Sequence, residues 1–308
     1  MCRALRLVAI TMLNVAFVVF VMPLGATAMT WTVDDPSDGI QCTGAQFASI
    51  QNAVNAANPL GGDIIVVCDG LYAEQVTIDR SLTIQAAASP QGDQAIVTVP
   101  PPPLTMTDPK AIIRVTGSPL LLVPVNVYID GLIVQGPGGG GCDSIRYGIR
   151  VDGGAMATLT NNLIKDIHDT PFGGCQNGIG ILVGRAAEGT TGSATIRENI
   201  IEDYQKGGIV VDNSGSSAVI MNNIIMGVGR TEVIAQNGVQ VSRGAMVPPT
   251  NLQGNTISAN FYWNRSPSTT PAVATGILYF QAGASGYEGP LNSGNTLRHN
   301  QVNVSVNP

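Results

Sequence analysis

The chain has 308 residues, of which only 12% are charged, against roughly 25% in an ordinary globular domain. A mean hydropathy of +0.21 excludes a disordered chain, because disorder needs low hydrophobicity and high net charge. With three lysines, a net charge of −6 and a pI near 4.8, the sequence offers no basic surface to a phosphate backbone, so no nucleic-acid partner is expected.

Residues 1–28 have the pattern of a signal peptide. Arg3 and Arg6 precede an apolar stretch that runs to about Leu24, and Ala26 and Ala28 provide a small-residue cleavage site. An uncleaved membrane anchor is the alternative, although the apolar run is at the short limit for a membrane span. Cleavage after residue 28 predicts a secreted chain, or a periplasmic or cell-surface one, with no membrane span left in it.

Residues 29–60 are predicted to form an N-terminal cap with a short helix. Phe47, Ile50, Val54 and Ala57 recur at the spacing of one apolar helix face. We expect this helix to cover the open end of the structure that follows.

Short strands dominate from residue 61 onward. Segments with alternating apolar residues predict strands at 63–67, 75–79, 81–84 and 127–134. The proline run at 100–103 cannot continue a strand, and it marks a loop outside them.

The second half of the chain repeats. A glycine followed by an apolar strand recurs at spacings of 32, 28, 30 and 38 residues, at Gly148, Gly180, Gly208, Gly238 and Gly276. Each unit also carries two short strands around an asparagine, namely Asn162, Asn199, Asn223, Asn255 and Asn300. Such a unit cannot bury its apolar side alone, whereas stacked coils can, with strands roughly 4.8 Å apart in parallel sheets. The asparagines should then form a ladder along the stack.

The cysteines that remain after the signal are even in number, which suits an oxidising compartment. Cys142 and Cys175 precede the repeating glycines of neighbouring coils by six and five residues, so stacking predicts a disulfide between them. Cys42 and Cys68 are left to pair and would join the cap to the first strand. The cysteine spacing fits no metal-ligand pattern, and no metal site is predicted.

This pattern resembles the right-handed parallel β-helix proteins of the pectate-lyase-like superfamily. Residues 47–54 and 62–74 are similar to the N-terminal segment of pectin methylesterases. The resemblance implies an all-β chain folded as a single-stranded right-handed parallel β-helix, a solenoid of about seven to eight coils over residues 61–308. The catalytic motifs of pectin methylesterases, polygalacturonases and pectate lyases are absent, so it is uncertain whether the chain is an enzyme; if it is, the activity is that of a polysaccharide lyase, a glycoside hydrolase or an epimerase.

The catalytic candidates are ionisable residues on the loops of two neighbouring units. Asp166, His168 and Asp169 lie close in sequence, Asp203 has the position of Asp166 one unit later, and Arg185 follows the next glycine strand. An imidazole between carboxylates can act as acid or base, or the group can hold a cation. A loop histidine hydrogen-bonded to Asp169 is the structural alternative.

The substrate-binding candidates lie on the glycine strands and in the longest late coil. Arg150, Asp152 and Asp212 are expected at outward positions along a groove, although solvated turn aspartates are the alternative. Tyr262 and Trp263 suit a sugar, because flat aromatic rings match its C–H faces, and core packing of the tryptophan is the alternative here.

These features predict a secreted β-helix protein that binds an extracellular or cell-wall polysaccharide and, in the stronger form of the hypothesis, processes it. A non-catalytic surface or structural protein of the adhesin type is the alternative function. The last coil has no evident cap in the sequence, so self-association is expected there. The sequence identifies no cofactor.

Overall fold

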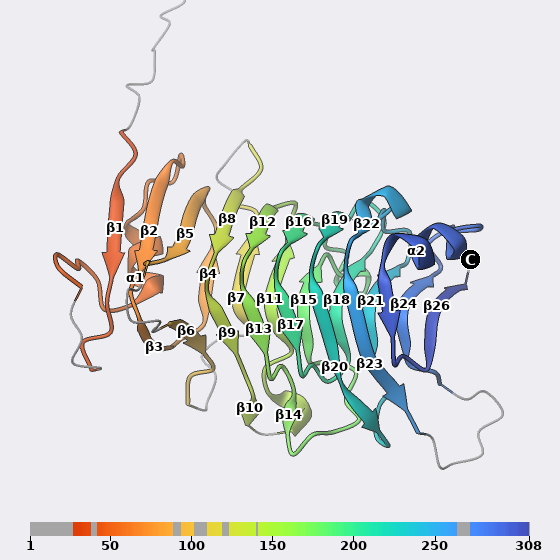
Figure 1. Cartoon of the computed structure of the whole chain (residues 1–308). Helices are drawn as coiled ribbons and strands as arrows, with labels where there is room; N and C mark the ends of the chain where they lie inside the picture. The colour runs from red at the N-terminus through yellow and green to blue at the C-terminus, as the bar shows by residue number, and fades with distance from the viewer. Residues whose placement is uncertain are drawn as a thin grey trace, which may run out of the picture.

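The computed structural model describes residues 27–37, 42–88, 94–101, 110–118, 123–139, 141–263 and 272–307. The predicted signal peptide lies outside these residues, except for its last two. The strands form three parallel sheets that run the length of the molecule, as Figure 1 shows by the strands lying side by side from red to blue.

Each coil gives one strand to each sheet. Sheet A contains, in stacking order, β1 (Thr30–Val33), β2 (Asp63–Val67), β5 (Leu82–Ala86), β8 (Asn126–Asp130), β12 (Met156–Thr160), β16 (Ser193–Arg197), β19 (Ser217–Met221) and β22 (Leu252–Gln253). Sheet B contains β3 (Gly70–Ala73), β6 (Ala95–Thr98), β9 (Ile133–Gln135), β13 (Leu163–Lys165), β17 (Ile200–Glu202), β20 (Ile224–Thr231), β23 (Thr256–Tyr262) and β25 (Thr296–Arg298). Sheet C contains β4 (Val76–Ile78), β7 (Ala111–Thr116), β11 (Tyr147–Asp152), β15 (Ile179–Val183), β18 (Gly207–Asp212), β21 (Asn237–Ser242), β24 (Thr275–Phe280) and β26 (Val302–Asn307).

Three smaller features complete the described part of the chain. Two helices, α1 (Ile50–Ala56) and α2 (Glu288–Gly294), lie at opposite ends of the stack (Figure 1). Single turns of 3₁₀ helix occupy Gly141–Asp143, Ala186–Glu188 and Pro249–Asn251, and β10 (Gly138–Gly139) pairs with β14 (Asp169–Thr170) beside the main sheets. The described strands from β2 to β24 make seven complete coils, in agreement with the predicted parallel β-helix.

The repeating glycine is required by close packing between successive coils. A methyl group on Gly208 would lie 2.5 Å from Cγ2 of Ile225 and 2.6 Å from the carbonyl oxygen of Gly238, both on the next coil. The same two obstacles surround Gly148, Gly180 and Gly238. Isoleucine from sheet B thus fills the space that a side chain at the glycine would occupy, which explains why the sequence repeats a glycine there.

The predicted asparagine ladder is present, with one correction. Four of the predicted asparagines lie in one row along the stack, namely Asn162, Asn199, Asn223 and Asn255. The side-chain nitrogen of each of the first three donates to the side-chain oxygen of the next. The following member is Asn295, whose side-chain oxygen accepts from Nδ2 of Asn255 at 2.9 Å. Asn300, predicted for that place, instead accepts from Nδ2 of Asn260 at 2.9 Å and lies at a different corner.

The two ends of the stack are covered differently. At the first coil, α1 buries Ile50, Ala53 and Val54, and Glu74 accepts the N–H of Ile50 at 2.7 Å. Phe47 was predicted on this helix but precedes it. At the other end, α2 comes between β24 and β25 in the chain, where a sheet A strand would follow, and it contacts β22, so this end has a partial cap. Self-association there stays a prediction.

Both predicted disulfides are present. Cys42 is bonded to Cys68 with their Cα atoms 6.4 Å apart, and this bond joins the segment before α1 to the end of β2. Cys142 is bonded to Cys175 with their Cα atoms 5.5 Å apart, and this bond joins neighbouring coils.

Candidate functional site

The outer side of sheet C carries a network of buried charges. Arg150 is fully buried, and its Nε donates to Asp152 at 2.6 Å while its terminal nitrogens bond to Glu188. Arg114, on the preceding coil, also donates to Asp152, at 3.1 Å. The guanidinium of Arg150 lies 5.2 Å from the centre of the Tyr147 ring, which adds a cation–π contact.

Asp212, on the second coil after that of Asp152, holds the segment next to Glu188 in place. One carboxylate oxygen accepts the N–H of Ala186 at 2.8 Å, and the other accepts from Ser242 at 2.7 Å and Arg243 at 2.9 Å. Burial alone would raise the pKa of Asp212, but these hydrogen bonds and the Arg243 charge together lower it below its usual value.

The segment 185–190 is therefore fastened over the outer side of sheet C, by Glu188 to Arg150 and by the Ala186 N–H to Asp212. Arg150, Asp152 and Asp212 lie outside the core, as predicted, but the structure buries all three and satisfies them internally. Direct contact with a ligand would require this segment to move, so their assignment as substrate contacts stays a prediction.

Beside this segment lies a cavity of about 280 Å³ that has a basic and aromatic lining. It is lined by Arg146, Tyr147, Gln176, Asn177, Arg185 and the Cys142–Cys175 disulfide. The guanidinium of Arg185 has no hydrogen-bond or ion-pair partner among the described residues. The Nδ2 of Asn177 donates to the carbonyl of Cys142 at 2.9 Å, which holds the amide on the cavity wall. We call this cavity the arginine pocket.

The predicted catalytic cluster is only partly assembled. Nδ1 of His168 lies 2.8 Å from the backbone carbonyl oxygen of Asp169, not from its carboxylate. That carboxylate is buried and accepts from Ser144 at 3.0 Å and from Gln205 at 2.7 Å. The Asp169 carboxylate thus holds together the loops that carry the Cys142–Cys175 disulfide. This supports a structural role for His168 and Asp169.

Asp166, His168 and Asp203 do lie near one another. Burial raises the pKa of Asp203, the negative charge of Asp166 raises it further, and the charges of His168 and Lys165 oppose the rise. Arg185, the fifth candidate, lines the arginine pocket instead. The structure tests no catalytic role, so these residues stay candidates for acid–base chemistry.

Tyr262 is the last residue of β23, and Trp263 follows it. The strands β20 and β23 are longer here than the other strands of sheet B. Trp263 is 45% exposed, so it is not a core residue. The guanidinium of Arg230, on β20, stacks 4.1 Å from the centre of the Trp263 ring. This exposed pair forms a flat surface of the kind that a sugar ring can contact.

Lys206 is a residue that the sequence analysis did not select. It is half-buried, its Nζ donates to the carbonyl of Ala235 at 2.9 Å, and burial lowers its pKa. Backbone hydrogen bonds place Arg146, Gly178 and Lys206 at one register position on successive coils. The scarcity of lysine, and its position directly before a repeating glycine strand, were the signals that could have found it.

Comparison with known proteins identifies the fold family. Residues 141–307 match the family described as "Right handed beta helix region". The chain belongs to this family.

None of the helices in the described part of the chain is long and apolar enough to cross a membrane.

The solved structure of a pectate lyase agrees with this assignment. The pectate lyase Pel9A superposes with a TM-score of 0.52 at 15% identity, covering 92% of this chain and 79% of the enzyme. A pectin methylesterase from Aspergillus niger gives a TM-score of 0.40 at 14% identity, covering 88% of this chain and 90% of that one. At 15% identity the likeness to the pectate lyase shows the fold alone.

One curated relative is similar in sequence. A cell surface glycoprotein of Methanothermus fervidus is 27% identical over 124 residues, which are 40% of this chain. The matched part is 16% of that glycoprotein's length, so it says nothing about the activity of the whole protein.

Proposed function

We propose that this chain is a secreted β-helix protein that binds an acidic polysaccharide, and that the arginine pocket holds one of its carboxylated sugars. The observation that carries the proposal is the lining of that pocket, where two arginines, Arg146 and Arg185, come together on an otherwise acidic chain.

The chemistry of this lining suits a uronate. A guanidinium presents two parallel N–H donors to a carboxylate, and Arg185 has none of its donors occupied by the described residues. Tyr147 forms a buried part of the wall, with the guanidinium of Arg150 over its ring, whereas the exposed Gln176 amide can bond to a sugar hydroxyl. Because the whole chain is negatively charged, binding should depend on this local positive charge and weaken as salt increases.

The comparisons support a role in polysaccharide binding at the cell surface, although they do not identify the ligand. The neighbours in fold include a pectate lyase and a pectin methylesterase, and the similar sequence is that of a cell surface glycoprotein. Two disulfides also suit an oxidising, extracellular environment.

A second candidate function is a non-catalytic surface protein of the adhesin type. One observation favours it: Arg150 and Asp212 hold the 185–190 segment in place and, like Asp152, are buried and not presented to solvent. If the chain does process a glycan, Asp166, His168 and Asp203 are the group that would supply acid–base chemistry, because they lie within electrostatic reach of one another.

The test compares binding of polygalacturonate, alginate and an uncharged polysaccharide by calorimetry, with a parallel assay for shortened or unsaturated products. We expect binding of an acidic glycan only, and Arg185→Gln should weaken it about tenfold, as for a lost charge-assisted hydrogen bond. Arg197→Gln, an exposed arginine on sheet A, is the matched control and should leave affinity unchanged. Equal binding of charged and uncharged glycans, or no effect of Arg185→Gln, would overturn the proposal. Binding without any product would favour the non-catalytic form.

A further inference from the structure

Arg114 and Arg150 are neighbours on sheet C that share one carboxylate. They lie directly opposite each other where β7 pairs with β11, and both guanidinium groups donate to the buried Asp152. Like charges on neighbouring strands repel each other, and one carboxylate neutralises only one of the two arginines. The charges that the strands themselves contribute here are therefore short of one anion.

Glu188 supplies that anion from outside the sheet. Its two carboxylate oxygens accept from Nη1 and Nη2 of Arg150, which is the bidentate arrangement that a guanidinium forms with any carboxylate. Arg150 is fully buried, whereas the Glu188 side chain is 39% exposed. The buried arginine thus holds a carboxylate that reaches it from the surface.

The segment that carries Glu188 is also held by other hydrogen bonds. The N–H of Ala186 donates to Asp212 at 2.8 Å. Nδ2 of Asn213 donates to the carbonyl of Thr190 at 3.0 Å. Rotation of the Glu188 side chain into water therefore leaves these bonds intact, and the movement that opens the arginine to a ligand is that of one side chain.

This place adjoins the arginine pocket. The guanidinium of Arg150 lies 5.2 Å from the centre of the Tyr147 ring, and Tyr147 lines the pocket. Arg185, which also lines it, precedes Glu188 by three residues on the same segment. A chain of acidic sugars carries a carboxylate on each unit, so a chain held in the arginine pocket presents further carboxylates to this side of sheet C.

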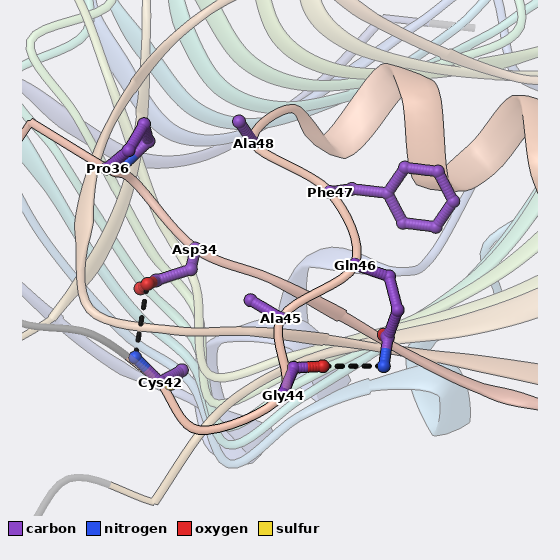
Figure 2. A pocket seen from close by; sticks show the side chains of 8 residues that line it. All are labelled: Asp34, Pro36, Cys42, Gly44, Ala45, Gln46, Phe47 and Ala48. Carbon is purple, nitrogen blue, oxygen red and sulfur yellow. Dashed lines mark hydrogen bonds between the residues drawn. The ribbon is translucent and has the colours of Figure 1, made fainter.

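The cavity at the N-terminal end of the stack lacks this chemistry. It has a volume of about 360 Å³ and is lined by Asp34, Pro36, Cys42 and the segment 44–48. Figure 2 shows the Asp34 side chain directed toward Cys42, whose N–H it accepts at 3.1 Å. The described residues that line this cavity include no lysine, arginine or histidine, so carboxylate binding is expected at sheet C and not at this end.

We propose that Arg150 forms a second carboxylate site, and that Glu188 occupies it as an internal competitor of the ligand. The carboxylate of a bound ligand takes the two terminal nitrogens of Arg150, and the Glu188 carboxylate turns into water. The charge of the buried network is unchanged, because one carboxylate replaces another. The site itself is independent of the polysaccharide proposal, whereas the acidic glycan as its ligand rests on that proposal.

The first experiment uses acetate as the probe and needs no glycan. Glu188→Ala removes the internal carboxylate and leaves room for a small external one. Thermal unfolding of the full chain is measured at pH 7 in sodium acetate and in sodium chloride of equal ionic strength. The gain in melting temperature from chloride to acetate should be about 2–5 °C larger for the variant than for the wild type, whose site is filled.

Glu198→Ala is the matched control for this experiment. It removes an exposed glutamate at the corner between β16 and β17, and acetate should raise its melting temperature no more than that of the wild type. A Glu188→Ala chain that folds in acetate and not in chloride counts as a gain.

A second experiment measures the binding of galacturonate and trigalacturonate by calorimetry. Glu188→Gln removes the competing charge, so it should bind trigalacturonate about tenfold more tightly than the wild type does. Galacturonate, a single sugar that the arginine pocket can hold alone, should bind both proteins equally. Glu198→Gln makes the same change in net charge at a distant place and should bind both sugars as the wild type does.

The two experiments separate the site from its ligand. A gain in acetate that is confined to Glu188→Ala supports the site, and tighter binding of trigalacturonate by Glu188→Gln supports the glycan as its ligand. If acetate stabilises Glu188→Ala no more than the wild type, the site is overturned. If trigalacturonate binds Glu188→Gln and the wild type equally, the glycan is not its ligand. A wild type that binds neither sugar contradicts the polysaccharide proposal, and the acetate result still decides the site.

Discussion

The side-chain amide of Asn199 donates to Oδ1 of Asn223 on the next coil at 3.0 Å, and the backbone N–H of Asn199 donates to the same oxygen at 3.0 Å. One oxygen thus satisfies two buried donors, and the amide of Asn223 in turn satisfies the carbonyl of Ile196. The ladder replaces the strand hydrogen bonds that are lost where the chain turns between sheets A and B.

Asn223→Ala should therefore destabilise the fold by about 3–5 kcal/mol, because the backbone N–H of Asn199 and the carbonyl of Ile196 lose these partners in the interior, and the Asn199 amide keeps only its bonds to backbone carbonyls. Chemical denaturation would measure the loss. Asn292→Ala, on the exposed side of α2, is the control, and it should change stability by less than about 0.5 kcal/mol. Equal effects of the two substitutions would contradict the role given to the ladder.

Gly208→Ala should cost about 1–3 kcal/mol, since the new methyl group would collide with Ile225 and with the backbone of Gly238. The measurement is the denaturation midpoint. Gly289→Ala is the matched control, because a methyl group at that position of α2 meets no atom within 4 Å. The interlocking of coils would be disproved if alanine were tolerated equally at both positions.

The stabilisation that Asp212 provides should depend on pH. Its folded-state pKa lies below the usual value of 3.8, so the ionised form stabilises the fold above about pH 4, and this contribution is lost as the pH falls through the folded pKa. The difference in unfolding free energy between the wild type and Asp212→Asn should therefore shrink between pH 6 and pH 3. A difference that stays constant over this range would contradict the assignment.

Cys175→Ser should destabilise the chain by about 3–4 kcal/mol, the loop-entropy value for a bond that spans 33 residues. It should also leave Cys142 as a free thiol. Labelling of the denatured, unreduced protein would detect one reactive thiol in the variant and none from this pair in the wild type. Absence of the new thiol would show that the pairing is different.

Trp263→Ala should weaken glycan binding by about three- to tenfold and leave the melting temperature unchanged, because the ring is exposed and packs on Arg230 and not on the core. Tyr128→Ala, an exposed aromatic residue on sheet A, serves as the control for a general loss of aromatic surface. If both variants bind glycan as the wild type does, the Trp263 surface is not a sugar contact.

The repeated features could be predicted from the sequence because each has a local physical cause. The glycine at position 208 is required because Ile225 fills the space that its side chain would need. Cys142 pairs with Cys175 because stacking brings equivalent positions of neighbouring coils together. The error at Asn300 arose because the last unit contains a second asparagine, Asn295, five residues earlier, and α2 shifts the spacing before it.

The candidate site was harder to predict, since it depends on loops that follow no period. Outward positions such as Arg150 are normally exposed in a stack, and the sequence gives no sign that the segment 185–190 folds over them. His168 bonds to a backbone carbonyl and Arg185 lines another cavity, so closeness in sequence did not translate into one cluster.

The glycine and isoleucine that interlock belong to successive coils, Gly148 with Ile164 and Gly180 with Ile201, and four consecutive joints between coils have the same two halves. A whole unit can therefore be duplicated or removed by recombination without leaving a mismatched joint, whereas a change of a few residues inside a strand cannot. The longer loops, such as the one that carries β14, lie beside the main sheets. They are free to vary in length and chemistry, so new specificities can arise in this architecture by exchange of loops on an unchanged stack.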